Sequence, residues 1–368
     1  MKAIGLIVEY NPFHNGHLHH INEAKKRSQA DVIIAVMSGS FSMRGNIAPI
    51  NKFEKTKIAL NHGIDLVIEL PFLYTNQSAD NFAYNAVYLL NQLNVDEIYF
   101  GSETDDIENL KKTALLLDSE IYNQALKKYL HLSYPIANDL VLKELGFTNP
   151  SSNDSLAIQY IRAINKLHSK IKPYSIKRID SSYNDIVPTS ENIASATAIR
   201  QLKDISPYVP DDVNEIYVKK GFLNDNMLFP YLKYKLKITD FASIQGFDDS
   251  LANLFSNANI NSPEDLNSLI SKRYTRSRIN RLLLNVLLDI KKYPKSDPSY
   301  IRVLGMNTKG QAYLNTIKKN ISIPLIVKVK EGINKDLDIE LKSSKIFSLL
   351  DDIYTLEFQK PIIFDKTK

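Results

Sequence analysis

Short apolar runs alternate with helical patterns along roughly the first two hundred residues of the chain. The runs are continuous and rich in β-branched residues, which is typical of strands buried on both faces. They lie at Ala3–Val8, Asp31–Met37, Asp65–Leu70 and Glu97–Gly101. Between them, apolar residues recur at the three-to-four spacing of amphipathic helices. These helical segments are His17–Lys26, Phe53–Asn61 and Ala79–Leu93.

The order strand, helix, strand at this rhythm predicts βαβ units and a parallel sheet. A fifth strand is expected at Tyr174–Ile179, after helices around Pro135–Leu145 and Asp154–Leu167. We therefore expect an α/β fold with a Rossmann-like, doubly wound parallel sheet. Ligands of such sheets bind beyond the carboxyl ends of the strands, so the loops that follow the strands are the first place to look for chemistry.

The pattern changes after roughly Gln201. A boundary is indicated by the cluster Pro207, Pro210, Asp211 and Asp212. The chain beyond it is helical and basic and lacks the strand alternation, except for a strand-like run at Ile321–Val329. Pro324 within that run predicts an edge strand, because proline cannot donate to a sheet ladder. We expect two domains, residues 1–205 with the parallel sheet and residues 206–368, which are mostly helical.

Composition narrows the class of protein without identifying it. The 368 residues are 44% hydrophobic and 24% charged, with a net charge of +5 and no cysteine. The absence of cysteine excludes disulfides, thiol nucleophiles and zinc ribbons, and it is consistent with a reducing compartment. The apolar N-terminal run is interrupted by Glu9 and is too short for a signal peptide. We expect a cytoplasmic protein.

The strongest chemical signal is the junction between the first strand and the first helix, Gly5–His17. His14 and His17 are three residues apart, so at a helix start they project toward the same side. Gly16 removes a side chain where the backbone must approach a ligand. The helix N-terminus adds backbone amides with partial positive charge. Two imidazoles, a glycine and a helix N-terminus together predict a phosphate-binding loop.

Two other interpretations of these histidines stay open. A His-x-x-His pair suits a metal ion, and His19 and His20 follow directly. Against a metal, no nearby carboxylate completes a familiar ligand set, and a helix N-terminus favours an anion over a cation. The histidines would alternatively be satisfied core or capping residues. His19 and His20 themselves are typical of a helix surface.

A second motif lies about 180 residues further on, at Ile193–Arg200. Ser195 and Thr197 suit a helix N-terminus, and Arg200 one turn later can clamp phosphate oxygens. Together with His-Asn-Gly-His, this string resembles the Ser-x-Thr-x-Ile-Arg signature of the class I nucleotidyltransferases, relatives of the class I aminoacyl-tRNA synthetases. That resemblance implies a nucleotidyltransferase-type Rossmann domain.

The resemblance extends along nearly the whole chain. Further strings follow one another as in the bacterial tRNA(Met) cytidine acetate ligases. They are Met37–Phe41, Arg44-Gly45, Asp65–Pro71, Phe100–Glu103, Ser271–Thr275 and Tyr300–Gly305. By this resemblance, residues 1–205 are expected to bind ATP and residues 206–368 to bind tRNA.

The family resemblance also implies an ATP-binding set, with His14 and His17 as catalytic residues. Its members in this sequence are Ile7, Val8, Glu9, Tyr10, Asn11, Pro12, Phe13, His14, Asn15, Gly16, His17, Leu18, His19, His20, Gly101, Asn153, Arg178, Ser195, Thr197 and Arg200. At Asn153 the chain departs from the family pattern. The family usually has Pro-Asn-Asn-Ile-Leu-Gly, whereas this chain has Pro-Ser-Ser-Asn-Asp-Ser-Leu-Ala from Pro150.

The activity that the family implies has two steps. Acetate attacks the α-phosphate of ATP, giving acetyl-adenylate and pyrophosphate. The exocyclic amine of the wobble cytidine of elongator tRNA(Met) then attacks the acetyl carbonyl, giving N4-acetylcytidine and AMP. Adenylation needs no protein nucleophile, so His14 and His17 are expected to stabilise charge on the phosphates, with Mg²⁺ carried by ATP and no metal ligand among the protein side chains. The sequence identifies neither the acetate pocket nor a general base for the second step.

A basic segment, Lys272–Lys295, favours contact with nucleic acid. Apolar residues within it keep helical spacing, which gives a helix with one buried side and a basic approach. We expect tRNA contacts from Lys272, Arg273, Tyr274, Arg276, Arg278 and Arg281. Basic side chains suit the phosphate backbone, and Tyr274 would stack on an unpaired base of the anticodon loop. A merely solvated helix face is the alternative.

Two other functions share part of this pattern. A small-molecule adenylyltransferase, of the pantetheine-phosphate or nicotinamide-mononucleotide type, has both phosphate motifs but leaves the basic second half of the chain unexplained. A non-catalytic RNA-binding protein explains the basic half but not the intact phosphate motifs.

Overall fold

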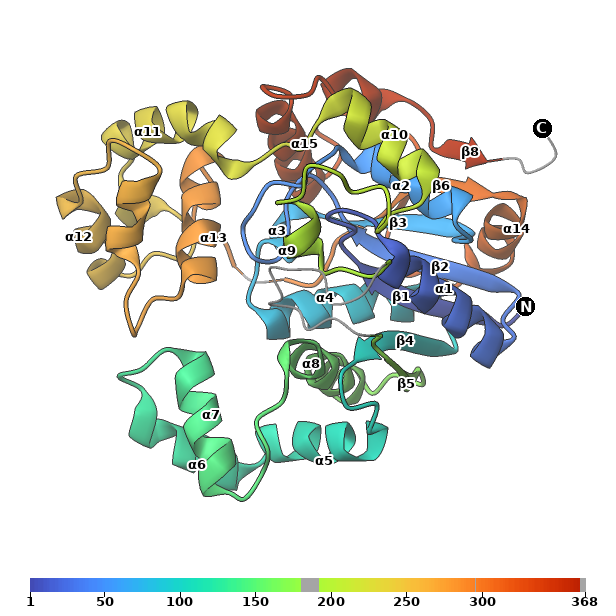
Figure 1. Cartoon of the computed structure of the whole chain (residues 1–368), viewed down its shortest axis with the longest axis horizontal. Helices are drawn as coiled ribbons and strands as arrows, with labels where there is room; N and C mark the ends of the chain where they lie inside the picture. The colour runs from blue at the N-terminus through green and yellow to red at the C-terminus, as the bar shows by residue number, and fades with distance from the viewer. Residues whose placement is uncertain (180–191, 295, 365–368) are drawn as a thin grey trace.

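The computed structural model of the chain describes residues 1–179, 192–294 and 296–364. Within those residues the core is one eight-stranded sheet in the order β5-β4-β1-β2-β3-β6-β7, with β8 paired to β6 (Figure 1). The strands are β1 (Ala3–Val8), β2 (Val32–Ser38), β3 (Leu66–Leu70), β4 (Glu97–Ser102), β5 (Lys172–Lys177), β6 (Ile301–Asn307), β7 (Leu325–Ile326) and β8 (Ile362–Phe364).

The first five strands form the expected parallel sheet, with β1 between β2 and β4. Side chains alternate between the two faces of each strand, as the period of two requires. In β2, Val32 and Ile34 belong to one buried cluster, and Ile33 belongs to another on the opposite face. The fold prediction, an α/β sheet of Rossmann type, is therefore confirmed.

Helices cover both faces of this sheet (Figure 1). The hydrophobic cluster on one face draws buried residues from α1, α2, α9 and α10, and the cluster on the other face draws them from α3, α4, α8 and α14. These helices are α1 (Asn15–Ser28), α2 (Lys52–Asn61), α9 (Ala196–Ile199), α10 (Asp211–Lys220), α3 (Phe72–Thr75), α4 (Ala79–Gln92), α8 (Ser152–Lys166) and α14 (Thr308–Ile317). Gly5 allows close packing here, because a Cβ at this position would lie 2.7 Å from the side chain of Leu90.

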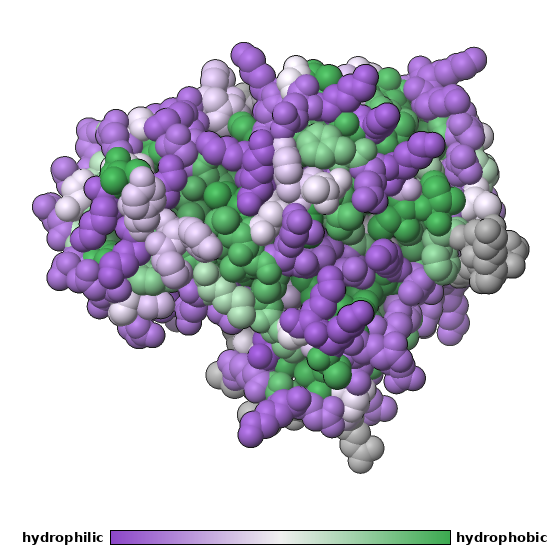
Figure 2. Space-filling view, turned by 90° about the horizontal axis from the view of Figure 1, so that it is seen from above, coloured by the Kyte–Doolittle hydropathy of each residue, from purple (hydrophilic) through white to green (hydrophobic). Residues whose placement is uncertain are grey.

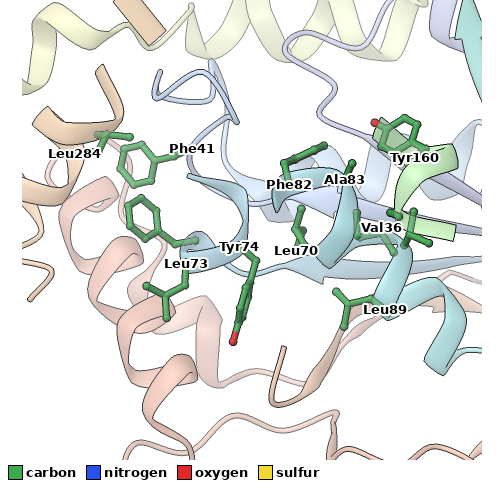
Figure 3. Close-up of a cluster of buried hydrophobic side chains, with 14 of the residues drawn as sticks. Val36, Phe41, Leu70, Leu73, Tyr74, Phe82, Ala83, Leu89, Tyr160 and Leu284 are labelled. Atoms are coloured by element: carbon green, nitrogen blue, oxygen red, sulfur yellow. The ribbon is translucent and has the colours of Figure 1, made fainter. Parts of the chain in front are cut away.

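Two helical groups extend from the sheet, one along the bottom of Figure 1 and one on its left. One is inserted between β4 and β5 and contains α5 (Ile107–Leu117), α6 (Glu120–Leu126), η1 (Lys127–Tyr129) and α7 (Tyr134–Glu144). The other contains η2 (Asp225–Leu228), α11 (Phe229–Ile238), η3 (Phe241–Ser243), α12 (Asp249–Asn257), η4 (Glu264–Leu269) and α13 (Arg276–Leu287). In Figure 3, Leu284 of α13 lies beside Phe41, and both belong to the cluster that contains Val36 and Leu89.

The chain then returns to the sheet. Strand β6 pairs antiparallel with β3, and β7 and β8 pair parallel with β6. Two further elements complete this part, α15 (Lys335–Phe347) and η5 (Tyr354–Phe358). The prediction of an edge strand around Pro324 is confirmed by β7, although that strand is only two residues long. The expectation that no other strand follows Gln201 is wrong, because β6 and β8 lie there.

A buried ion-pair network holds this returning part against the sheet. Lys52 Nζ lies 2.5 Å from Glu69 Oε1, 2.8 Å from Glu340 Oε1 and 2.7 Å from Glu357 Oε1. Arg302 of β6 pairs with Glu69 at 2.9 Å and also with Glu357. Burial alone would lower the pKa of Lys52, but the three carboxylates outweigh it and raise that pKa. Strands and charges from residues 296–364 are thus built into the sheet of residues 1–179, on the other side of the proposed domain boundary at 205.

Hydrophilic side chains cover most of the upper face of the molecule, with hydrophobic residues exposed in patches between them (Figure 2). Among the described residues, no helix has the length and apolar character needed to cross a membrane.

Candidate active site

A cavity of about 500 Å³ lies beyond the carboxyl ends of β1, β4 and β5. Ile7 and Val8 contribute from β1, Phe100 and Gly101 from β4, and Ile176 from β5. This is where ligands bind in open parallel sheets. The members of the predicted ATP-binding set that line it are Ile7, Val8, Glu9, Tyr10, Asn11, His14, Gly16, His17, His19, His20, Gly101, Asn153, Arg178, Ser195, Thr197 and Arg200.

His14 and His17 form the N-terminal cap of α1. His14 is the N-cap residue, and its Nδ1 accepts a hydrogen bond from Gly16 N at 3.1 Å. In return, His17 Nδ1 accepts from His14 N at 3.3 Å. The two rings stack with their centroids 3.7 Å apart. A nitrogen that accepts a backbone N–H carries no proton, so each neutral ring keeps its proton on Nε2 and can donate it to a ligand.

Both rings are neutral at pH 7. Burial, followed by the charge of Arg178, lowers the pKa of His14 to about 3. Burial lowers the pKa of His17 well below 6.5, and that of His20 to about 4. The predicted capping role and the predicted phosphate contact are therefore compatible, because capping uses Nδ1 and leaves Nε2–H for an anion.

Gly16 is required by the same geometry. A Cβ at this position would lie 2.9 Å from Cε1 of His14, which is closer than real Cβ contacts. Any side chain here would displace the capping ring. The glycine thus keeps His14 seated on the helix N-terminus.

The second motif reaches the first, although about 180 residues separate them. Ser195 Oγ caps α9 by accepting from Ala198 N at 3.0 Å. Arg200 donates to the carbonyl oxygen of Asn11 at 2.5 Å and to Thr197 Oγ1 at 3.3 Å. The guanidinium is therefore anchored on the loop that carries the two histidines.

Gly101, Asn153 and Arg178 meet at one rim of the cavity. A Cβ at Gly101 would lie 3.4 Å from Arg178 Cγ, so the two residues are in direct contact. Asn153 Nδ2 donates to Glu103 Oε1 at 2.5 Å, and Arg178 Nε lies 3.9 Å from the same oxygen. Despite its altered sequence context, Asn153 lies at the cavity.

Four predicted residues, Pro12, Phe13, Asn15 and Leu18, do not line the cavity. Phe13 is buried and packs edge-on against Tyr10, with ring centroids 4.8 Å apart. Asn15 Nδ2 donates to the carbonyl oxygens of Asn192 and Pro207. These side chains shape the loop and hold the second motif against it, so a direct contact with ATP is not expected of them.

Sequence reasoning missed a second group of lining residues. They are Ser42, Arg44, Asn46, Ile47, Pro49, Leu156, Tyr160, Lys177, Ile179, Ile193, Ala196, Leu223, Asn224 and Asp225. The Arg44-Gly45 string is part of the family resemblance, but the resemblance implies no role for it. Asp225 gave no local signal at all.

A buried lysine supports the loop from below. Lys55 Nζ donates to the carbonyl oxygens of Glu9 at 3.0 Å and Ser38 at 2.8 Å. Burial lowers its pKa to about 7. The carboxylate of Glu9 accepts from Met43 N at 2.8 Å, and burial raises the pKa of that carboxyl. The lysine thus ties the ends of β1 and β2 together beneath the phosphate loop.

The predicted basic helix is α13, capped by Thr275. Lys272 and Arg273 precede it and Arg276 begins it, and all three are exposed, whereas its apolar residues are buried as expected. Tyr274 corrects the prediction. The residue is 7% exposed, and the guanidinium carbons of Arg273 and Arg278 lie 5.4 and 5.1 Å from the centroid of its ring. In this conformation it cannot stack on a base, and Lys295, the last residue of the basic segment, lies outside the described residues.

No group of three or more His, Asp or Glu side chains among the described residues has the geometry to hold a metal ion.

A parallel sheet with imidazole donors at a helix N-terminus and an arginine anchored on the same loop defines a nucleotidyltransferase of the His-x-Gly-His type. The chain belongs to the HIGH Nucleotidyl Transferase family, whose model matches residues 1–360. Within this superfamily it belongs to the tRNA(Met) cytidine acetate ligases, as the following similarities show.

Two relatives with that name resemble the chain over almost all of its length. The protein of Caldicellulosiruptor saccharolyticus is 40% identical and covers 99% of both chains. That of Thermoanaerobacter sp. strain X514 is 39% identical and covers 99% of this chain and 97% of its own. The crystal structure of apo Thermotoga maritima TmcAL superimposes with a TM-score of 0.90 at 30% identity, covering 99% of this chain and 100% of that one. TmcAL bound with alpha-thio ATP gives a TM-score of 0.88 at 29% identity, with the same coverage.

Proposed function

We propose that this protein activates acetate with ATP and transfers the acetyl group to N4 of the wobble cytidine of elongator tRNA(Met). One observation supports this function above all: the two phosphate motifs, distant in sequence, meet in one cavity beside a basic helix. The similarity to tRNA(Met) cytidine acetate ligases runs through all of these parts. We also infer a cytoplasmic location, because the proposed substrate is a tRNA.

In the first step, a carboxylate oxygen of acetate attacks the α-phosphorus of ATP. The bond from that phosphorus to the bridging oxygen breaks, and pyrophosphate leaves with the electron pair. His14 and His17 would donate from Nε2–H to phosphate oxygens, and the amides of the α1 N-terminus would add their partial charge. Arg200 would clamp the same phosphates. Fixed donors of this kind are already oriented before charge develops, which is why they favour the transition state.

The remaining predicted ligands would position the nucleotide. Gly101 and Ile176 line the cavity at the strand ends, and Arg178 lines it beside them. Mg²⁺ would accompany the phosphates and neutralise the departing pyrophosphate. Because the histidines are uncharged at pH 7, the cation and the arginines supply the positive charge, and the imidazoles supply directed hydrogen bonds.

In the second step, the cytidine amine attacks the acetyl carbonyl and AMP leaves. The tRNA would be held by Lys272, Arg273, Arg276, Arg278 and Arg281, whose side chains suit the phosphate backbone. We propose residues 1–205 as the ATP-binding part and residues 206–368 as the tRNA-binding part, with β6 to β8 returning to the shared sheet.

The test uses ATP with labelled pyrophosphate to follow exchange, and labelled acetate with a tRNA(Met) transcript to follow transfer, with ATP, acetate and tRNA each omitted in turn. The wild-type protein should exchange pyrophosphate into ATP only when acetate is present, and should label the tRNA only when all three are present. His14→Ala should lose the exchange and keep its affinity for tRNA. Exchange at the wild-type rate in this variant would exclude the role of His14, and exchange driven by nicotinamide mononucleotide instead of acetate would select a small-molecule adenylyltransferase.

A further inference from the structure

Asp225 lies in the wall of the cavity, and no part of the first step uses it. It comes from the segment after α10, far along the chain from the phosphate loop. Its Oδ1 accepts a hydrogen bond from Ile47 N at 2.7 Å, and its Oδ2 accepts from Asn46 Nδ2, also at 2.7 Å. Both donors belong to the hairpin formed by residues 41–47, and together they fix the plane of this carboxylate.

The two hydrogen bonds leave the carboxylate able to accept a proton. Each carboxylate oxygen has two lone pairs, so one remains on each oxygen. The residue is exposed at the surface and lines the cavity. The surrounding protein desolvates it and raises its pKa, against the opposing effects of Ile47, Asn46 and the charge of Arg200. A positioned, accessible carboxylate of raised basicity has the properties of a proton acceptor.

The hairpin that holds Asp225 also contacts the basic helix. Residues 41–47 form a tight turn, with Ser42 N donating to Asn46 O at 2.8 Å. Gly45 lies directly against α13, because a Cβ on it would be 2.5 Å from Arg281 N. Arg281 in turn donates to the carbonyl oxygen of Met43 at 3.4 Å. RNA held along α13 would therefore reach the cavity beside this hairpin and beside Asp225.

Glu9 is the other carboxylate among the described lining residues. Glu9 is less suitably placed than Asp225 for contact with the cytidine of an incoming tRNA. It follows directly on β1, its carboxylate is bonded to Met43 N, and Lys55 lies beneath it. Asp225, by contrast, is bonded to the hairpin, feels the charge of Arg200 and is exposed to solvent.

We propose that Asp225 is the catalytic base of the acetyl-transfer step, a role that rests on the function proposed above. The lone pair of the cytidine N4 attacks the acetyl carbonyl carbon, and the new C–N bond forms. Asp225 takes one N4 proton as the nitrogen becomes positive. The tetrahedral intermediate then collapses, the bond to the phosphate oxygen breaks, and AMP leaves with the electron pair. The proton passes from Asp225 to solvent when the product departs.

The test separates the two half-reactions in Asp225→Asn, which keeps the shape of the side chain. Adenylation is measured as acetate-dependent exchange of pyrophosphate into ATP without tRNA. Transfer is measured in a single turnover, from preformed acetyl-adenylate to a tRNA(Met) transcript, between pH 5 and 8. Because positioned bases contribute on the order of 10²-fold or more, transfer should fall at least tenfold further than exchange. The decline of the wild-type transfer rate toward low pH should disappear.

Two further variants keep the test decisive. Asn46→Ala removes one hydrogen bond from the carboxylate and should shift the pH dependence of transfer while keeping a measurable rate. Asp352→Asn, an exposed aspartate outside the cavity, is the matched control and should behave as wild type. Transfer by Asp225→Asn within threefold of wild type would overturn the inference, as would equal losses in transfer and exchange. A wild-type protein that exchanges pyrophosphate but never acetylates tRNA would instead overturn the proposed function.

Discussion

His14 links the phosphate loop to the stability of the protein at acid pH. The ordinary pKa of histidine is 6.5, and in the folded chain burial and Arg178 lower that of His14 to about 3. Between these values the unfolded chain binds a proton that the folded chain does not. The stability due to neutral His14 is therefore complete above pH 6.5 and is lost as the pH falls toward 3. Each pH unit in this window removes about 1.4 kcal/mol, so the loss between pH 7 and pH 5 is about 2 kcal/mol.

The variant His14→Asn removes this titration and retains a residue that caps helices well. We expect the unfolding free energy of the variant to fall by about 2 kcal/mol less than that of wild type between pH 7 and pH 5. Urea unfolding at the two pH values measures this difference. Far-ultraviolet circular dichroism is the suitable signal, because the chain has no tryptophan.

The control for this comparison is His131→Asn, since His131 is exposed on the insertion between β4 and β5. It should lose as much stability on acidification as the wild type does. If His14→Asn also loses as much as wild type, the ring is not held neutral by the fold, and the assignment of His14 as an uncharged Nε2–H donor fails with it.

Three other substitutions test separate parts of the structure. Lys52→Met leaves three buried carboxylates with too few cations and should lower the unfolding free energy in urea by about 3–5 kcal/mol. Gly45→Ala places a Cβ against Arg281 N at a φ of +78°, so it should cost about 1–3 kcal/mol and slow transfer to tRNA more than pyrophosphate exchange. Arg273→Glu combined with Arg276→Glu should weaken tRNA binding, most strongly at low salt, and leave acetate-dependent exchange intact; unchanged affinity in a filter-binding assay would exclude this surface.

Strands β1, β2 and β3 were predictable because each is a short, mostly apolar run, whereas β5 (Lys172–Lys177) begins and ends two residues before the predicted range Tyr174–Ile179. Strand β1 has the predicted bounds, and β2 and β3 differ from them by a residue. Strand β6 was missed although it is fully buried. Its sequence contains Arg302, and a charged residue argues against a buried strand until its partners are known. Those partners are Glu69 and Glu357, the first of which is more than two hundred positions away. Burial of a charge depends on tertiary structure, so a local pattern cannot reveal it.

The residues of the candidate site also fall into two groups: some can be predicted from their neighbours in the sequence, and others depend on contacts with distant residues. The phosphate loop could be predicted because its chemistry is contained in a few consecutive residues: His14 and His17 cap the helix that they begin. Asp225 could not, because its donors at Asn46 and Ile47 are 179 and 178 positions away. A lone aspartate at the start of a short helical turn has the same local sequence whether or not its carboxylate accepts a proton. Only the fold brings it to the hairpin that α13 also touches. The base of the second step would thus be positioned by the same contact that brings the RNA, which ties acetyl transfer to correct docking.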